Sequence, residues 1–87
     1  MRWTLEYSKQ SLKDARRLRE ANLWKRTEKL LDVLRSNPFQ NPPPYEKLTG
    51  NLSRRYSRRV NLQHRLVYEV LEGERIVRIL RIWSHYE

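Results

Sequence analysis

The chain has 87 residues, a length that suits one small domain with a thin hydrophobic core, so we expect residues 1–87 to form a single domain. It has no cysteine, which excludes a disulfide framework, a thiolate nucleophile and a cysteine-based zinc site, and which fits a cytoplasmic protein. Nineteen Lys and Arg residues against ten Asp and Glu leave a net charge of +9, which favours a nucleic acid or an acidic protein as partner. The longest purely apolar run, Leu66 to Tyr68, is too short for a membrane span or a signal peptide, so we expect neither.

The chain begins with the alternation of a half-buried strand. From Arg2 to Tyr7 every second residue is apolar or aromatic, starting at Trp3, and the residues between them are polar. Ser8 follows, and a serine at this place is a good helix N-cap. We therefore predict a short strand followed directly by a helix.

The next segment has helical periodicity. Apolar residues recur at intervals of three and four from Leu12 to Leu34, with Lys and Arg on the opposite face. This stripe fits one long helix or two. Asn22 is a good N-cap, so we predict a break between Ala21 and Leu23 and a helical hairpin. The second helix must end before Asn37-Pro38, because a proline disfavours helical backbone in the residue before it.

All four prolines lie between Asn37 and Pro44. Proline restricts the backbone, so this segment is predicted to be a stiff connector rather than a flexible linker. A proline-rich segment can also bind another domain, but a rigid crossing that brings Tyr45 and Glu46 to a fixed place is the simpler interpretation.

Three strands are predicted in the remainder of the chain, over Arg55 to Leu62, His64 to Leu71 and Arg75 to Trp83. Glu72 to Glu74 would form the hairpin loop between the last two. The order of elements is therefore β-α-α-β-β-β. This order predicts an α+β fold in which a helical hairpin packs on one face of an antiparallel sheet and leaves the other face free for a ligand.

The predicted strands are rich in arginine. No acidic residue occurs from Lys47 to Tyr68, both included, whereas six Lys or Arg residues do. Two of these arginines, Arg58 and Arg59, together with Arg81 on the last strand, are expected to contact RNA phosphates.

The side chains available for catalysis favour acid–base chemistry on a phosphodiester. The two histidines are not spaced as a metal-binding pair, and glycine-rich phosphate loops are absent, so we expect no metal and no cofactor. RNA can be cleaved by a base, an acid and a cation that stabilises the phosphate. Glu46, His85 and Arg65 are one candidate for each role.

Strand register decides whether two of these residues share a face. If the loop is Glu72 to Glu74, Arg65 pairs with Arg81, and His85 falls on the same face. A loop that differs in length by one residue moves His85 to the other face. The catalytic hypothesis therefore requires an odd-length loop or a compensating β-bulge.

Simpler interpretations remain open for each residue. Glu46 is also compatible with an ordinary surface carboxylate, and Arg65 with a solvated strand residue. His64 is interpreted as structural, and Tyr86 either anchors the last strand or stacks on a base. From the residues alone, a ribonuclease and a non-catalytic module that binds nucleic acid or an acidic partner are about equally supported.

The chain resembles the Txe/YoeB family of toxins from type II toxin–antitoxin systems, within the RelE-like superfamily. The run S-R-R-V-N-x-x-H-R-L-V-Y over residues 57–68 carries most of the resemblance. The other matching segments are Asn37-Pro38-Phe39, Tyr45-Glu46-Lys47-Leu48, Asn51-Leu52-Ser53 and Trp83-Ser84-His85-Tyr86-Glu87.

This resemblance implies a microbial-ribonuclease-like fold and an mRNA endoribonuclease that acts at the ribosomal A site. It assigns Glu46 as general base, Arg65 as the phosphate-stabilising residue and His85 as general acid. Tyr86 would position the substrate, and Arg59 would face RNA.

The resemblance also implies partners. These are the ribosome, its mRNA and a cognate antitoxin with an acidic, amphipathic tail, through which the pair would act on operator DNA. Monomer and homodimer both stay open. Two features depart from the family. Arg54 stands where a glycine is often found and adds charge near the site, and Glu87 follows the His-Tyr pair.

Overall fold

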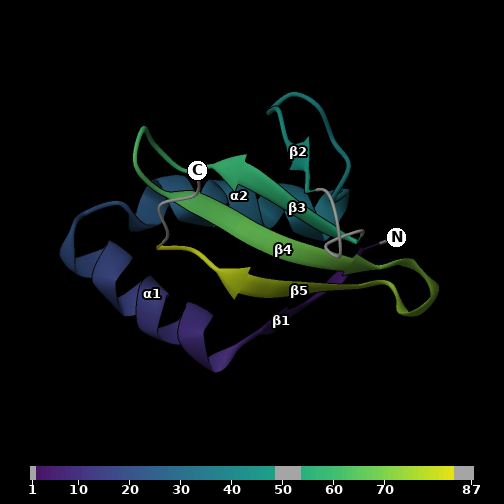
Figure 1. Cartoon of the computed structure of the whole chain (residues 1–87), viewed down its shortest axis with the longest axis horizontal. Helices are drawn as coiled ribbons and strands as arrows, with labels where there is room; N and C mark the ends of the chain where they lie inside the picture. Colours follow the sequence, from purple (N-terminus) through teal and green to yellow (C-terminus); the bar gives the residue numbers. More distant parts are fainter. Residues whose placement is uncertain (1, 49–53, 84–87) are drawn as a thin grey trace.

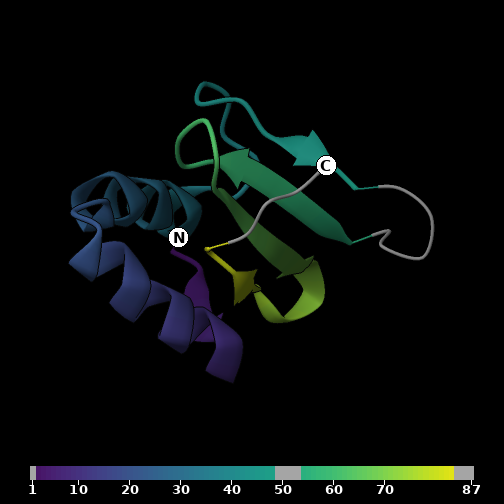
Figure 2. The same ribbon diagram turned by 60° about the vertical axis from the view of Figure 1, so that its left-hand side comes forward.

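The computed structural model describes residues 2–48 and 54–83 and shows two helices packed against one face of a curved sheet (Figure 1). Turned by 60°, the helices lie on one side and the sheet on the other (Figure 2). The elements in chain order are β1 (Thr4–Tyr7), α1 (Lys9–Glu20), α2 (Trp24–Ser36), β2 (Glu46–Lys47), β3 (Arg55–Arg59), β4 (Arg65–Leu71), the short 3-10 helix η1 (Glu72–Glu74) and β5 (Ile76–Arg81).

The α+β fold class predicted from the sequence is confirmed, but the sheet is mixed rather than wholly antiparallel. Its strand order is β1-β5-β4-β3-β2, and β1 pairs with β5 in parallel. The strands β3, β4 and β5 follow one another through short connections, which forces them to be antiparallel. β1 is separated from the other strands by both helices, so no hairpin restricts its direction. The sequence also did not predict β2, which is only two residues long.

The helical hairpin is confirmed, with one correction at the turn. Ser8 caps α1 as predicted, because its Oγ accepts a hydrogen bond from the Ser11 N–H at 3.0 Å. Asn22 is not the N-cap of α2. It follows the end of α1 in the left-handed conformation, with φ of 64°, and its N–H bonds the Arg19 carbonyl at 3.1 Å. Asparagine tolerates this conformation better than most residues, so it ends one helix here rather than beginning the next.

The core lies between the helices and the face of the sheet that the alternation predicts. Tyr68 in β4 and Leu18 in α1 are completely buried. The buried apolar cluster is completed by residues from both helices and the three central strands and their flanks: Ala15, Leu30, Leu31, Leu34, Val60, Leu66, Val70, Val77, Ile79 and Ile82. The opposite face of the sheet is not covered by either helix (Figure 2).

The β4–β5 hairpin contains the β-bulge that the catalytic hypothesis allowed. Leu71 pairs with Ile76, so the connection has an even number of residues rather than the predicted three. Tyr68 then pairs with Ile79, whereas Val67 pairs with Arg81, so Leu80 is the extra residue of the bulge. An even-length loop places each residue of β5 on the face opposite to the one that an odd-length loop would give. The one-residue bulge shifts the pairing back, so the residues after Leu80 lie on the faces that an odd-length loop would give. Within the described part of the chain, no helix is long and apolar enough to cross a membrane.

Candidate active site

Glu46 and Arg65 meet on the face of the sheet opposite the helices. The Arg65 Nη1 donates to Glu46 Oε1 at 3.0 Å and to the hydroxyl of Ser57 at 3.3 Å. The sheet register explains the contact, because Glu46 on β2 pairs with Ser57 on β3, and Ser57 pairs with Val67 on β4. Three adjacent strands therefore bring together two residues that are 19 positions apart in the chain.

A small cavity of about 70 Å³ surrounds this pair. Arg59 lies beside it, because Arg59 on β3 is the direct partner of Arg65 on β4. The Glu46 side chain is 68% exposed, whereas that of Arg65 is 17% exposed, so Arg65 is held firmly and Glu46 remains accessible. The complete lining is Pro44, Tyr45, Glu46, Ser57, Arg59 and Arg65. Such a cavity can hold a phosphate between two guanidinium groups with a carboxylate in reach of it.

Arg58 is not on this face, and its predicted RNA contact is wrong. Its side chain is 1% exposed and points towards the helix side of the sheet, below the proline-rich connector. The guanidinium donates to the carbonyls of Pro43 at 2.6 Å, Gln40 at 2.8 Å and Pro38 at 3.0 Å, and to the hydroxyl of Tyr68 at 3.1 Å. The alternation along β3 already indicated this side, because Arg58 follows Tyr56 and precedes Val60 on it.

Tyr68 completes the contacts below the connector. Its hydroxyl donates to the Pro38 carbonyl at 3.1 Å and accepts from Arg58. Burial raises the pKa of Tyr68 to about 12, although the neighbouring Arg58 guanidinium acts in the opposite direction. The phenol therefore keeps its proton and remains a donor.

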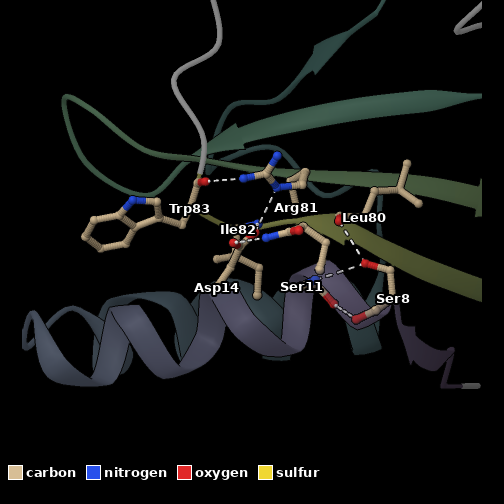
Figure 3. A network of polar contacts seen from close by, with 8 residues as sticks. Ser8, Ser11, Asp14, Leu80, Arg81, Ile82 and Trp83 are labelled. Atoms are coloured by element: carbon tan, nitrogen blue, oxygen red, sulfur yellow. Dashed lines mark hydrogen bonds and ion pairs between the residues drawn. The ribbon is translucent and has the colours of Figure 1, made fainter.

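Arg81 makes an internal ion pair, and its contact with RNA stays a prediction. Its Nε donates to Oδ2 of Asp14 at 3.0 Å, and its Nη2 donates to the Trp83 carbonyl at 2.9 Å. Asp14 is completely buried and also accepts the Ile82 N–H at 2.9 Å. Figure 3 shows Asp14 reaching from α1 to the end of β5. These contacts favour a structural role for Arg81.

Hydrogen bonding controls the charge of Asp14. Burial alone would raise the pKa of this carboxyl, but donors from Ile82, Gln10, Arg81 and Trp83 together lower it. Asp14 is therefore a buried anion at neutral pH. Sequence reasoning missed it, although the spacing of Ser11, Asp14 and Leu18 places the carboxylate on the apolar stripe of α1.

The end of the described chain is held by ring contacts. Trp83 stacks on His64 with ring centroids 3.9 Å apart, and the Arg17 guanidinium lies 4.7 Å from the Trp83 ring. These contacts support the predicted structural role of His64, whose backbone N–H donates to the Asn61 side chain at 2.7 Å in the turn before β4. His85 and Tyr86 lie outside the described residues, so their predicted roles rest on the sequence.

A search of residues 2–48 and 54–83 finds no cluster of three His, Cys, Asp or Glu side chains that could hold a metal ion. Within the described part of the chain, the candidate site consists of Glu46, Ser57, Arg59 and Arg65.

Comparison with known proteins identifies a family. Residues 7–86 match the family described as the YoeB-like toxin of bacterial type II toxin–antitoxin systems. Toxin YoeB of Synechocystis sp. is 34% identical over 68 residues, which are 78% of this chain and 77% of that protein.

Solved structures agree with this match. A YoeB dimer from Staphylococcus aureus is 30% identical, with a TM-score of 0.83 over 99% of this chain and 100% of that one. The toxin in a YoeB–YefM complex from the same organism is 31% identical, with a TM-score of 0.79 and the same coverage. A YoeB/ParE toxin from Agrobacterium tumefaciens has a TM-score of 0.85 over 95% of this chain and 99% of that one; at 24% identity it supports the fold alone. The chain therefore belongs to the YoeB-like toxin family of bacterial type II toxin–antitoxin systems.

Proposed function

We propose that this chain is an endoribonuclease that cleaves mRNA on the ribosome, at the codon in the A site, and thereby inhibits translation. The observation that carries the proposal is the Glu46–Arg65 contact of 3.0 Å in a cavity on the uncovered face of the sheet. Members of the YoeB toxin family are generally ribonucleases, and a base beside a phosphate-binding arginine is the pair of groups that RNA cleavage needs.

Glu46 is the general base in this proposal. It removes the proton from a ribose 2′-hydroxyl, and the 2′-oxygen attacks the adjacent phosphorus. The bond from phosphorus to the 5′-oxygen breaks, which leaves a 2′,3′-cyclic phosphate and a 5′-hydroxyl. Arg65 stabilises the charge that develops on the phosphate, and its planar guanidinium suits two phosphate oxygens at once. The reaction requires two proton transfers, and both are assigned to side chains rather than to a metal ion.

His85 is proposed as the general acid that protonates the leaving 5′-oxygen, and Tyr86 as the residue that positions the substrate. Both assignments come from the match of the final Trp-Ser-His-Tyr segment to the family. Arg59 is proposed to bind a flanking phosphate, because it is exposed and lines the same cavity.

The small size of this cavity supports a role for the ribosome. A volume of about 70 Å³ holds a phosphate group but encloses little of a nucleotide. We infer that the protein alone binds RNA weakly at this site and depends on the ribosome to present the mRNA in a reactive conformation.

The proposed partners are a cognate antitoxin and the ribosome. The S. aureus relative has been solved with YefM and also as a dimer. The net charge of +9 suits an acidic antitoxin segment that covers the basic face and suppresses cleavage. Binding to operator DNA would occur through the antitoxin. Cleavage of mRNA on ribosomes would take place in the cytoplasm.

The test uses purified ribosomes with a defined mRNA codon in the A site. Glu46→Gln and His85→Gln are each expected to slow cleavage at saturating enzyme by about 10²- to 10⁴-fold, the usual contribution of a general base or acid. Glu20→Gln is the matched control, because it removes an exposed carboxylate at the end of α1 and should cleave at the wild-type rate.

Three results would count against the proposal. Wild-type cleavage by both Glu46→Gln and His85→Gln would show that these side chains are not the base and the acid. Absence of cleavage by the wild-type protein on ribosomes would leave a non-catalytic, nucleic-acid-binding module as the better explanation. Equal cleavage of free mRNA and ribosome-bound mRNA would remove the ribosome from the mechanism.

A further inference from the structure

Arg58 is a buried arginine whose donor nitrogens all bind neighbouring groups. Its Nε, Nη1 and Nη2 donate to one hydroxyl and three backbone carbonyls. Within the described residues no carboxylate lies within ion-pair distance of this guanidinium. Burying a cation is unfavourable unless its hydrogen bonds are satisfied. The buried guanidinium therefore depends on the segment that supplies those three carbonyls.

That segment is the proline-rich connector, residues 37–44. Pro38, Gln40 and Pro43 supply the three carbonyls. Proline has no N–H, so a segment with four prolines has many acceptors and few donors of its own. Its internal hydrogen bonds run from the N–H groups of Phe39 and Gln40 to Asn37 and from the Gln40 side chain to the Pro42 carbonyl. The carbonyls of Pro38, Gln40 and Pro43 bind donors from outside the segment. Arg58 supplies the missing donors from one rigid, planar group.

The connector leads directly to the general base of the proposed function. Tyr45 packs over the Arg58 guanidinium at 5.0 Å from its ring centroid, and the ring also lies edge-on to Tyr56 at 5.8 Å. Glu46 is the next residue and contacts Arg65. The chain is thus held at Pro43, at Tyr45 and at Glu46 in succession.

We propose that Arg58 is a positioning residue for RNA cleavage: by binding the connector carbonyls and Tyr45, it holds Glu46 opposite Arg65. This inference rests on the proposed function for its effect on rate, but the positioning itself is a property of the fold. Arg58 acts from the opposite face of the sheet and does not touch the substrate.

Arg58→Lys is the informative variant because it keeps the charge. A lysine ammonium has three donors from one point and cannot reach carbonyls on different sides as the guanidinium does. The connector then loses at least one contact, and Glu46 shifts relative to Arg65. A misplacement of about 1 Å costs about 10²-fold in rate, so we expect kcat to fall about 10- to 100-fold while the KM for ribosomes stays within about twofold.

Tyr68→Phe is the second variant and protects the test against a folding failure. It removes only the hydroxyl that binds Arg58 and Pro38, and the ring remains in the core. We expect a smaller fall in kcat, about three- to tenfold, in the same direction. Leu18→Val is the control for destabilisation, because it trims a buried side chain in α1, which packs on β5 and α2 rather than on the connector.

Two measurements test the inference together. The first is the rate of cleavage in single and double variants. Arg58→Lys should slow the wild-type enzyme but leave the residual rate of Glu46→Gln unchanged, because the two residues act as a unit. Additive losses would overturn the inference.

The second measurement is the side-chain NMR signal of the Arg65 guanidinium, which does not depend on activity. Arg58→Lys and Tyr68→Phe should move this signal in the direction that Glu46→Gln moves it, whereas Leu18→Val should leave it in place. An unmoved signal in Arg58→Lys overturns the positioning role even if Glu46→Gln abolishes cleavage. If Glu46→Gln instead cleaves normally, the proposed function fails while the NMR signal still decides whether Arg58 positions Glu46.

Discussion

Two segments of the chain, the proline-rich connector and the end of β5, are each held by a buried charged side chain, and the two charges have opposite signs. Arg58 holds the proline-rich connector that leads to Glu46, and Asp14 holds the end of β5. The connector presents carbonyls, so its anchor is a cation with several donors. The end of β5 presents N–H groups from Ile82 and Trp83, so its anchor is an acceptor. The sign of each buried charge thus matches the backbone groups that the neighbouring segment leaves unpaired.

The two anchors differ in how their charge is balanced. Asp14 has a cationic partner in Arg81, whereas the charge of Arg58 is met by carbonyl dipoles and a hydroxyl. Removing a buried charge that has collected several hydrogen bonds leaves all of those partners unsatisfied. Arg58 has more hydrogen-bond partners outside its own strand than Asp14 has outside its own helix, so the loss of Arg58 should lower stability more.

The largest expected effect is therefore that of Arg58→Met, which keeps most of the side-chain volume but removes every donor. We expect the free energy of unfolding to fall by about 3–5 kcal/mol, because three carbonyls and the Tyr68 hydroxyl lose a partner. Urea unfolding monitored by tryptophan fluorescence measures this. The exposed Arg16→Met is the control and should change stability by less than about 0.5 kcal/mol. A loss of less than about 1 kcal/mol in Arg58→Met would contradict the anchoring role.

Asp14→Ala should have the next largest effect, a loss of about 2–3 kcal/mol in the same unfolding assay. It leaves the buried Ile82 N–H unsatisfied and frees one end of Arg81. Asp32→Ala is the matched control on α2, because the Asp32–Arg35 ion pair is exposed and should contribute at most about 1 kcal/mol. Equal losses in the two variants would show that the buried position of Asp14 is unimportant.

Alkaline pH should weaken the Arg58 anchor through Tyr68. The folded protein keeps the Tyr68 proton up to a pKa of about 12, whereas the unfolded chain loses it near 10.0. Stability from this group is complete below pH 10 and falls as the pH rises towards 12, by up to about 1.4 kcal/mol for each pH unit. Unfolding at pH 8 and pH 11 should show a steeper loss in the wild type than in Tyr68→Phe. Equal losses of stability in the wild type and in Tyr68→Phe would show that ionisation of Tyr68 does not weaken the Arg58 anchor.

The smallest effect is expected from Arg81→Gln. The Arg81 side chain is 43% exposed, and the backbone donors to Asp14 remain, so stability at pH 7 should fall by at most about 1 kcal/mol. Hydrogen bonds lower the pKa of Asp14 in the folded state, so its contribution is present above the unfolded pKa and is lost as the pH falls through the folded pKa. Removing Arg81 raises that folded pKa. Acid unfolding should then begin at a higher pH than in the wild type, and an unchanged acid transition would mean that the backbone donors alone stabilise the anion.

Much of the fold could be predicted because the local patterns are strong. Alternation along β3 and β4 indicates the buried face of each strand, and on β3 it places Arg58 with Tyr56 and Val60. What failed was the interpretation of that arginine, because a basic residue in a basic chain suggested RNA. Asn22 was misread for a similar reason: asparagine suits both a helix N-cap and a left-handed turn residue, and only the hydrogen bond from its N–H to Arg19 distinguishes them.

The sequence by itself determined the helical hairpin, the three central strands, the face of each strand that is buried and the family to which the chain belongs. These follow from local periodicity and from short motifs, which involve neighbours in the chain. Only the tertiary structure decided that β1 pairs in parallel with β5, that Leu80 forms a bulge and that Glu46 meets Arg65 beside Ser57. It also decided that Arg58 lies below the connector and Asp14 at the end of β5. Each of these contacts joins residues at least eight positions apart, and their energy depends on packing and hydrogen bonds that no local pattern encodes.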